Sequence, residues 1–194
     1  HHVILDTTTG KVLEKQPVFD GVDICRFDSK KNEWIKETGA KIKGKTTNTN
    51  HANIVVGKYH YFLAHDVKYA GRLNTETGKM EYLELPAQMM PSKESRGGDK
   101  LLWTKPHKGN KPTNAQGMEI GRKGHNGSGW GHISAASPIL VGKHLIWPVV
   151  TGTVYVLDTS KEAWDQSAIT SINDLGEGGK TWTLSSFSFA HGRL

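Results

Sequence analysis

Cysteine is almost absent from this sequence, which has a single one, Cys25, among 194 residues. One cysteine cannot form an internal disulfide or supply a cysteine-based zinc cluster. Cys25 lies in the alternating apolar segment 22–27, which predicts an inert strand cysteine, with a catalytic thiol as the alternative. No apolar run reaches the length of a membrane-spanning helix, so no transmembrane segment is predicted.

Short β-branched and aromatic runs separated by glycine are abundant in residues 137–158. Residues 139–141, 145–150 and 154–157 are predicted to be strands, because such runs favour β structure. The turns between them are too short for the crossover that parallel strands require. Ala163 and Trp164 are predicted to begin a fourth strand, which would complete a four-stranded antiparallel meander.

The same phrase recurs elsewhere in the chain. Residues 53–64 match the first two strands of the meander, and residues 72–82 match the third strand, its turn and the fourth strand. Residues 3–13 match that second half again, and residues 186–194 match a first strand with its turn. Recurrence of one pattern in register indicates a repeat fold.

A common turn follows the third strand of each repeat. It has the form Leu-Asp-x-x-Thr-Gly-Lys in residues 5–11, and residues 74–79 and 157–161 carry close variants. Trp164 follows the last of these turns, and residues 27–34 look like the kelch-type variant. The whole pattern, which covers about half of the chain, resembles the PQQ-like (quinoprotein-type) β-propeller repeat. Proteins with this repeat include quinoprotein alcohol dehydrogenases and non-enzymatic scaffold propellers.

The resemblance implies an all-β fold made of propeller blades, each a four-stranded antiparallel meander. Residues 1–194 would form part of one β-propeller domain with about three blades, some of them partial. Because a closed propeller needs several blades, we expect a fragment or one part of a larger propeller. A compact β-sandwich of similar size is the alternative.

A long segment rich in glycine, proline and lysine, residues 86–132, interrupts the repeats as an insertion. Its prolines argue against a long helix or a central strand, although residues 101–103 could form an inserted strand. Residues 92–124 hold eight Lys or Arg and three acidic residues, so most of the net charge of +6 is local. One interpretation is that this positive charge keeps an exposed insertion soluble. The other is that it binds an anionic ligand. Nucleic acid is not favoured, because only Trp103 and Trp130 are available for stacking.

The richest candidate site lies in residues 121–138, where five glycines fall within eleven residues. These glycines let the backbone approach a ligand, but no Gly-Lys-Ser/Thr ends this stretch as in a phosphate-binding loop. By the repeat register, its residues lie before an innermost strand, at the mouth of a central channel. The ligand-binding candidates are Trp130, His132, His125, His51 and His107. These histidines could bind a metal or act in catalysis. The alternative is that they form structural hydrogen bonds to turns at the ends of blades.

Three hypotheses for the function follow. The first, which we adopt, is a PQQ-like propeller that acts as a binding or scaffold module, in the periplasm or secreted, with other blades or a protein as partners. The second is a quinoprotein dehydrogenase that oxidises an alcohol or sugar with pyrroloquinoline quinone (PQQ) and calcium. The lone Cys25 departs from the vicinal disulfide typical of that branch, and no catalytic aspartate aligns. The third is a propeller hydrolase or lyase that uses the loop histidines with Glu119 or Asp99.

Overall fold

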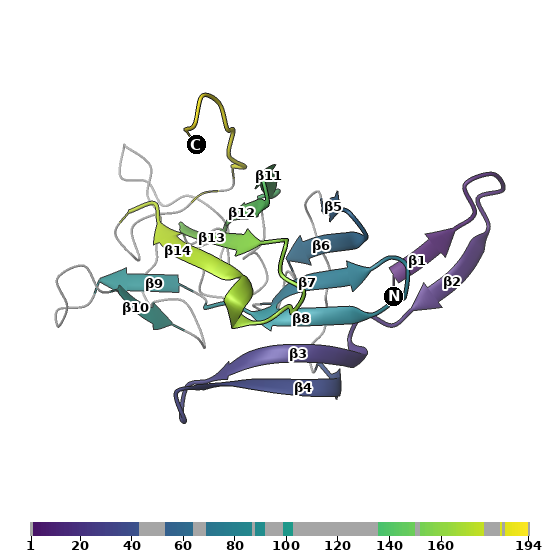
Figure 1. The fold of residues 1–194 in the computed structure, drawn as a ribbon, viewed down its shortest axis with the longest axis horizontal. Helices are drawn as coiled ribbons and strands as arrows, with labels where there is room; N and C mark the ends of the chain where they lie inside the picture. The colour runs from purple at the N-terminus through teal and green to yellow at the C-terminus, as the bar shows by residue number, and fades with distance from the viewer. Residues whose placement is uncertain are drawn as a thin grey trace, which may run out of the picture.

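In the computed structural model, the described residues form strands, turns and one short 3₁₀ helix (Figure 1). It describes residues 2–42, 53–63, 69–86, 88–91, 99–102, 136–149, 152–176, 183 and 185–193. The strands are β1 (His2–Leu5), β2 (Val12–Gln16), β3 (Asp20–Asp28), β4 (Glu33–Lys41), β5 (Ile54–Val56), β6 (Tyr59–Leu63), β7 (Tyr69–Asn74), β8 (Met80–Glu84), β9 (Gln88–Pro91), β10 (Asp99–Leu102), β11 (Ile139–Val141), β12 (His144–Pro148), β13 (Thr153–Asp158) and β14 (Ile169–Asp174). The prediction of an all-β chain is confirmed for these residues.

The larger sheet has six strands in the order β4-β3-β8-β7-β6-β5. Its β5–β8 part is the antiparallel meander predicted from residues 53–64 and 72–82. The β3–β4 hairpin extends this meander, because β3 pairs with β8 in parallel, with Cys25 opposite Leu83. The sheet therefore departs from a four-stranded blade at this edge.

The smaller sheet is a four-stranded antiparallel meander in the order β11-β12-β13-β14. Its first three strands agree with the prediction to within a few residues. The predicted start of the fourth strand at Ala163 and Trp164 is wrong, because β14 begins at Ile169 after the 3₁₀ helix η2 (Gln166–Ala168). Asp165 caps η2 by accepting a hydrogen bond from the Ser167 backbone N–H, so the chain turns here instead of extending.

Two separate hairpins complete the described strands. β1 and β2 pair antiparallel and project from one end of the molecule, and β9 pairs with β10 within the predicted insertion (Figure 1). The inserted strand predicted at residues 101–103 is thus found at Asp99–Leu102. Near the C-terminus, Ala190 and Arg193 form an isolated bridge rather than the predicted strand. His191 and Gly192 in that turn both have positive φ, unlike the Gly-Lys turns of the repeats.

The two meanders use the same turns at equivalent positions. Gly57 and Gly142 each open a two-residue hairpin loop with φ near +60°, a conformation that favours glycine. After the third strand, the backbone N–H and Oγ1 of Thr75 both donate to the carbonyl oxygen of Lys58. Thr159 bonds to the carbonyl oxygen of Lys143 in the same way. The sequence repeat is therefore also a structural repeat.

The hydrophobic core fills the space between the two sheets. Tyr61, Leu63 and Leu83 of the larger sheet pack with Trp147 and Tyr155 of the smaller one. A second cluster, which includes Phe62, Leu73 and Tyr82, lies on the opposite face of the larger sheet. The described residues thus contain two packed meanders but no closed ring of blades. They include no helix that is long and apolar enough to span a membrane.

Candidate functional site

The candidates chosen from the sequence lie outside the described residues. This holds for Trp130, His132, His125, His51 and His107, and for most of the basic insertion 86–132. Their proposed roles therefore remain predictions. Within the described part of the chain, the most developed polar site lies between the two sheets.

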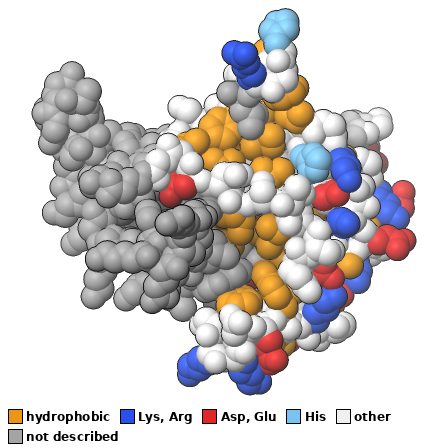
Figure 2. All heavy atoms as spheres, turned by 60° about the vertical axis from the view of Figure 1, so that its left-hand side comes forward, with side chains coloured by type: hydrophobic (Ala, Val, Ile, Leu, Met, Phe, Trp, Pro, Cys, Tyr) orange, Lys and Arg blue, Asp and Glu red, His pale blue; other side chains and the backbone are white. Residues whose placement is uncertain are grey.

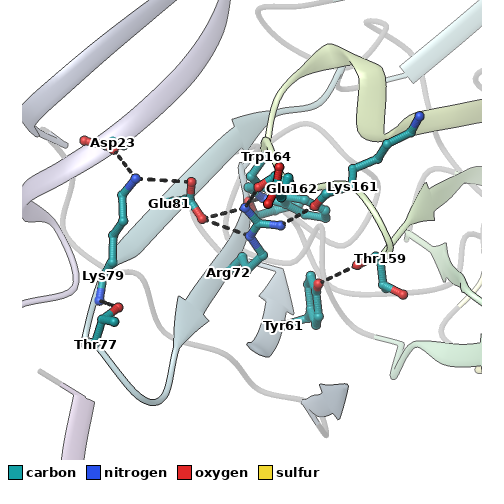
Figure 3. Close-up of polar contacts among 11 residues, drawn as sticks. Asp23, Tyr61, Arg72, Thr77, Lys79, Glu81, Thr159, Lys161, Glu162 and Trp164 are labelled. Carbon is teal, nitrogen blue, oxygen red and sulfur yellow. Dashed lines mark hydrogen bonds and ion pairs between the residues drawn. The ribbon is translucent and has the colours of Figure 1, made fainter. Parts of the chain in front are cut away.

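Arg72 is the centre of this polar site. It lies in β7 opposite Glu81 of β8, and its side chain is fully buried. The guanidinium donates to Glu81 Oε2 from Nε at 3.0 Å and from Nη2 at 2.6 Å. It also donates to two backbone carbonyls of the connection between β13 and β14, to that of Lys161 at 2.8 Å and to that of Glu162 at 2.7 Å. A buried arginine with this many partners is fully satisfied, and here it links two repeats (Figure 3).

Aromatic rings pack around the same guanidinium. The Cζ atom of Arg72 lies 4.2 Å from the ring centroid of Tyr59 and 5.1 Å from that of Trp164. Both distances suit cation–π contacts, which are stronger when water is excluded. The indole Nε1–H of Trp164 donates to the carbonyl oxygen of Ala70 at 2.8 Å. Trp164 therefore fastens the β13–β14 connection to β7.

Further ion pairs continue from this centre along the larger sheet. The Lys79 ammonium lies 2.9 Å from Asp23 and 3.6 Å from Glu81 (Figure 3). Its hydrogen bond to Asp23 raises the pKa of Lys79 above its usual value. Glu81 is thus shared between Arg72 and Lys79, and the four charges of the network balance.

A groove of about 130 Å³ opens beside this network, between β3, β4, β8 and the β13–β14 connection. Lys36 and Asp165 form an ion pair of 2.6 Å across its wall. Burial would raise the pKa of Asp165, but hydrogen bonds from Lys36 and Ser167 outweigh it and lower the value to about 2. The lining residues are Asp23, Ile24, Cys25, Lys36, Glu37, Thr38, Glu81, Ala163, Trp164 and Asp165.

Cys25 borders this groove and is buried, as expected for an inert strand cysteine. Its thiol donates to Gln166 Oε1 at 3.5 Å, and burial raises its pKa. A thiol with a raised pKa is protonated at neutral pH and is a poor nucleophile. The geometry around Cys25 therefore favours packing over catalysis.

Each charged side chain that lines the groove has a partner of opposite charge. Asp23 pairs with Lys79, Glu37 with Arg26, Glu81 with Arg72, and Lys36 with Asp165. The part of the chain that the structure describes contains no group of three or more His, Cys, Asp or Glu side chains that could hold a metal. The contacts of Arg72 with residues 161 and 162 and of Lys36 with Asp165 join the larger sheet to the β13–β14 connection.

Sequence reasoning missed Arg72, although a signal was present. The strand Tyr69–Asn74 has no other charged residue, and a lone arginine in an apolar strand needs a buried partner. Reasoning from the sequence also passed over the segment 39–46, which matches the pattern Gly-x-x-x-x-Gly-Lys-Thr. A phosphate-binding loop needs its backbone amides turned toward the ligand, whereas Ala40 and Lys41 are paired with β3 in the sheet. The part of the match that the structure describes is therefore strand and not a phosphate-binding loop.

Comparison with known proteins found no family model and no curated protein that matches the sequence.

Proposed function

We propose that this chain forms part of a PQQ-like β-propeller that acts as a binding or scaffold module. The observation that carries the proposal is the residue-specific joint between two repeats, centred on Arg72 and Trp164. Repeated sheets that fasten to one another through buried groups can build a rigid platform, and loops at its ends are then available for partners.

The equivalence of the two meanders supports the propeller architecture. In both, a Gly-Lys turn joins the first two strands, and a threonine after the third strand binds the lysine carbonyl. They pack face to face through their apolar surfaces, as adjacent blades do. A β-sandwich of two sheets shares the packing but does not require this residue-by-residue repetition.

The state of the buried polar groups supports a scaffold over an enzyme. Arg72, Glu81 and Asp165 are engaged by partners in their own sheet or in the neighbouring one. Catalytic groups need an approach for substrate and a pKa suited to proton transfer, whereas these groups are held in ion pairs. The described residues contain no group of three or more His, Cys, Asp or Glu side chains that could hold a metal, so we derive no step through a quinone.

The remaining parts of the proposal come from the resemblance and the composition. We propose that the protein resides in the periplasm or outside the cell, and that its partners are other blades or a protein. The basic residues of the insertion 86–132 would meet an anionic ligand.

A titration of the purified protein with PQQ and calcium tests the scaffold function against the dehydrogenase. We expect no stoichiometric quinone absorbance and no retained metal after gel filtration, as measured by absorption spectroscopy and elemental analysis. Titration with calcium alone is the control for non-specific cation binding. Stoichiometric quinone with bound calcium would replace the scaffold with a dehydrogenase. A retained transition metal would replace it with a histidine-site enzyme.

A further inference from the structure

The hairpin β1–β2 reproduces the second half of a repeat in detail. Asp6 Oδ1 accepts hydrogen bonds from the backbone N–H groups of Thr8 and Thr9. Asn74 Oδ1 accepts the equivalent bonds after β7, from Glu76 and Thr77. Gly10 and Gly78 close the two turns with φ of +70° and +71°. Strand β1 is therefore the counterpart of β7, and β2 is the counterpart of β8.

Within the described part of the chain, no strands beside β1 correspond to the first half of that repeat. Strand β7 pairs with β6 on one edge and β8 on the other, and β13 pairs likewise with β12 and β14. Among the described residues, β1 pairs with β2 alone. The edge of β1 that corresponds to the β6 side of β7 therefore offers backbone hydrogen-bonding groups to another strand.

Two polar residues after β1, Asp6 and Thr7, indicate which groups a strand paired with β1 should present. Thr7 is the counterpart of Thr75 and Thr159, which each donate twice to the carbonyl oxygen of a lysine in a Gly-Lys turn. Thr7 itself makes no hydrogen bond with the described residues. Asp6 is the counterpart of Asp158, whose Oδ2 lies 2.8 Å from the Lys143 ammonium. The Asp6 carboxylate forms no ion pair within the described part of the chain.

Apolar side chains beside this edge are exposed where their counterparts are buried. Leu5 is 51% exposed, whereas its counterparts Leu73 and Leu157 are 1% and 0% exposed. Val3 is 44% exposed, and its counterpart Tyr155 is 2% exposed. The opposite face of the hairpin is already in contact with the larger sheet, since the rings of His2 and His60 lie 5.5 Å apart. The face of the hairpin that carries Val3 and Leu5 is thus apolar like the buried faces of the meanders, but no sheet of the described residues covers it.

We propose that the edge of β1, with Asp6 and Thr7, docks a β-hairpin whose strands are apolar and whose turn is Gly-Lys. The first strand after that turn would pair with β1, the lysine carbonyl would accept from Thr7, and the lysine ammonium would pair with Asp6. This inference rests on the proposed repeat architecture and specifies the kind of partner that would bind to it. The partner is a hairpin of the type that β5–β6 and β11–β12 represent within the chain.

A fluorescent peptide with the sequence of residues 137–149 tests this docking, because it contains the Gly142-Lys143 turn. We expect saturable binding to the whole protein, measured by fluorescence anisotropy. Thr7→Val removes one hydrogen-bond donor and should weaken binding about three- to ten-fold. Asp6→Asn keeps the turn acceptor that Asn74 provides in its own repeat but loses the charge, and it should weaken binding to a similar degree. Lys143→Gln in the peptide should match the effect of Asp6→Asn.

Thr8→Val is the matched control, since only the backbone N–H of Thr8 takes part in the turn. Binding that is absent, or that is equal for the wild-type, Thr7→Val and Thr8→Val proteins, would overturn the docking proposal. Exchange of the peptide with β11–β12 of the chain would give such Thr7-independent binding. The quinone titration is a separate readout: a bound quinone would remove the scaffold function whatever the peptide does, and a failed peptide experiment leaves that function untouched.

Discussion

The two meanders β5–β8 and β11–β14 share their hairpins but differ in the link between their third and fourth strands. Strand β7 reaches β8 through the tight turn of residues 75–79, whereas β13 reaches β14 through residues 159–168. The longer link contains Lys161, Glu162 and Trp164, which contact Arg72 and Ala70 of the other meander. The short turn only joins two strands of the larger sheet. The long link joins two strands of the smaller sheet and also binds that sheet to the larger one.

The third strands differ in a matching way. Arg72 of β7 is the counterpart of Val156 of β13, so a charge in one repeat replaces an apolar side chain in the other. The carbonyls of Lys161 and Glu162 require donors once they are covered by β7, and Arg72 supplies them. The polar residue and the long link therefore depend on each other. On one face of the molecule, a strip of hydrophobic side chains lies beside a region rich in Lys, Arg, Asp and Glu (Figure 2).

The largest expected effect comes from Arg72→Met, which makes β7 resemble β13. It leaves Glu81 and two carbonyls without their buried donor, so we expect a loss of about 3–5 kcal/mol in the free energy of unfolding. Urea denaturation followed by tryptophan fluorescence measures this loss. Arg26→Met is the matched control, because the side chains of the Arg26–Glu37 pair are 48% and 34% exposed and the pair should contribute at most about 1 kcal/mol. Equal losses in the two variants would show that Arg72 is not the joint between the repeats.

A second contrast concerns the residue before that position, Gly71 in β7 and Tyr155 in β13. Each lies opposite an aromatic residue of the preceding strand, Gly71 opposite Phe62 and Tyr155 opposite Trp147. A Cβ atom on Gly71 would lie 2.3 Å from Cζ of Phe62, and Gly71 is not among the residues with positive φ. The glycine is therefore needed for space and not for its backbone conformation.

Gly71→Ala should accordingly lower the free energy of unfolding by about 1–3 kcal/mol, because Phe62 is buried against Tyr82 and has little room to move. Chemical denaturation of Gly71→Ala, Phe62→Leu and the double variant measures the coupling between the two sites. We expect the alanine to cost clearly less in the Phe62→Leu background. Strictly additive losses would mean that the Phe62 ring does not set the requirement for glycine.

Local sequence patterns predicted the strands of both meanders except β14, because the determinants of those strands and of their tight turns are local. Gly57 and Gly142 mark hairpin loops, and Asn74 marks a turn that its own side chain closes. The parallel pairing of β3 with β8 joins segments far apart in the sequence, so no local pattern indicates it. Trp164 carries an apolar signal that resembles a strand, but its side chain is buried against the neighbouring sheet.

The joint around Arg72 was not predicted for the same reason. Histidines and glycines suggest ligand chemistry wherever they cluster, and His132 and Trp130 stay predictions because they lie outside the described residues. The joint around Arg72 forms only when carbonyls from residues 161 and 162 approach β7. Such a contact depends on how two sheets pack, and composition or spacing within one segment does not determine it.

The smallest expected effect is the pH dependence that the Asp165 carboxyl of the long link contributes. The Asp165 carboxyl has its pKa lowered from 3.8 to about 2 in the folded protein, so folding favours its ionised form. Its contribution to stability is present above pH 4 and is lost as the pH falls from about 4 to about 2. Thermal unfolding of the wild-type protein and Lys36→Met across that range measures the contribution. Lys36 donates the hydrogen bond that lowers the pKa, so the variant should be less stable at neutral pH and should lose less on acidification. Parallel curves for the two proteins would mean that the Lys36–Asp165 pair does not help to hold the link against β4.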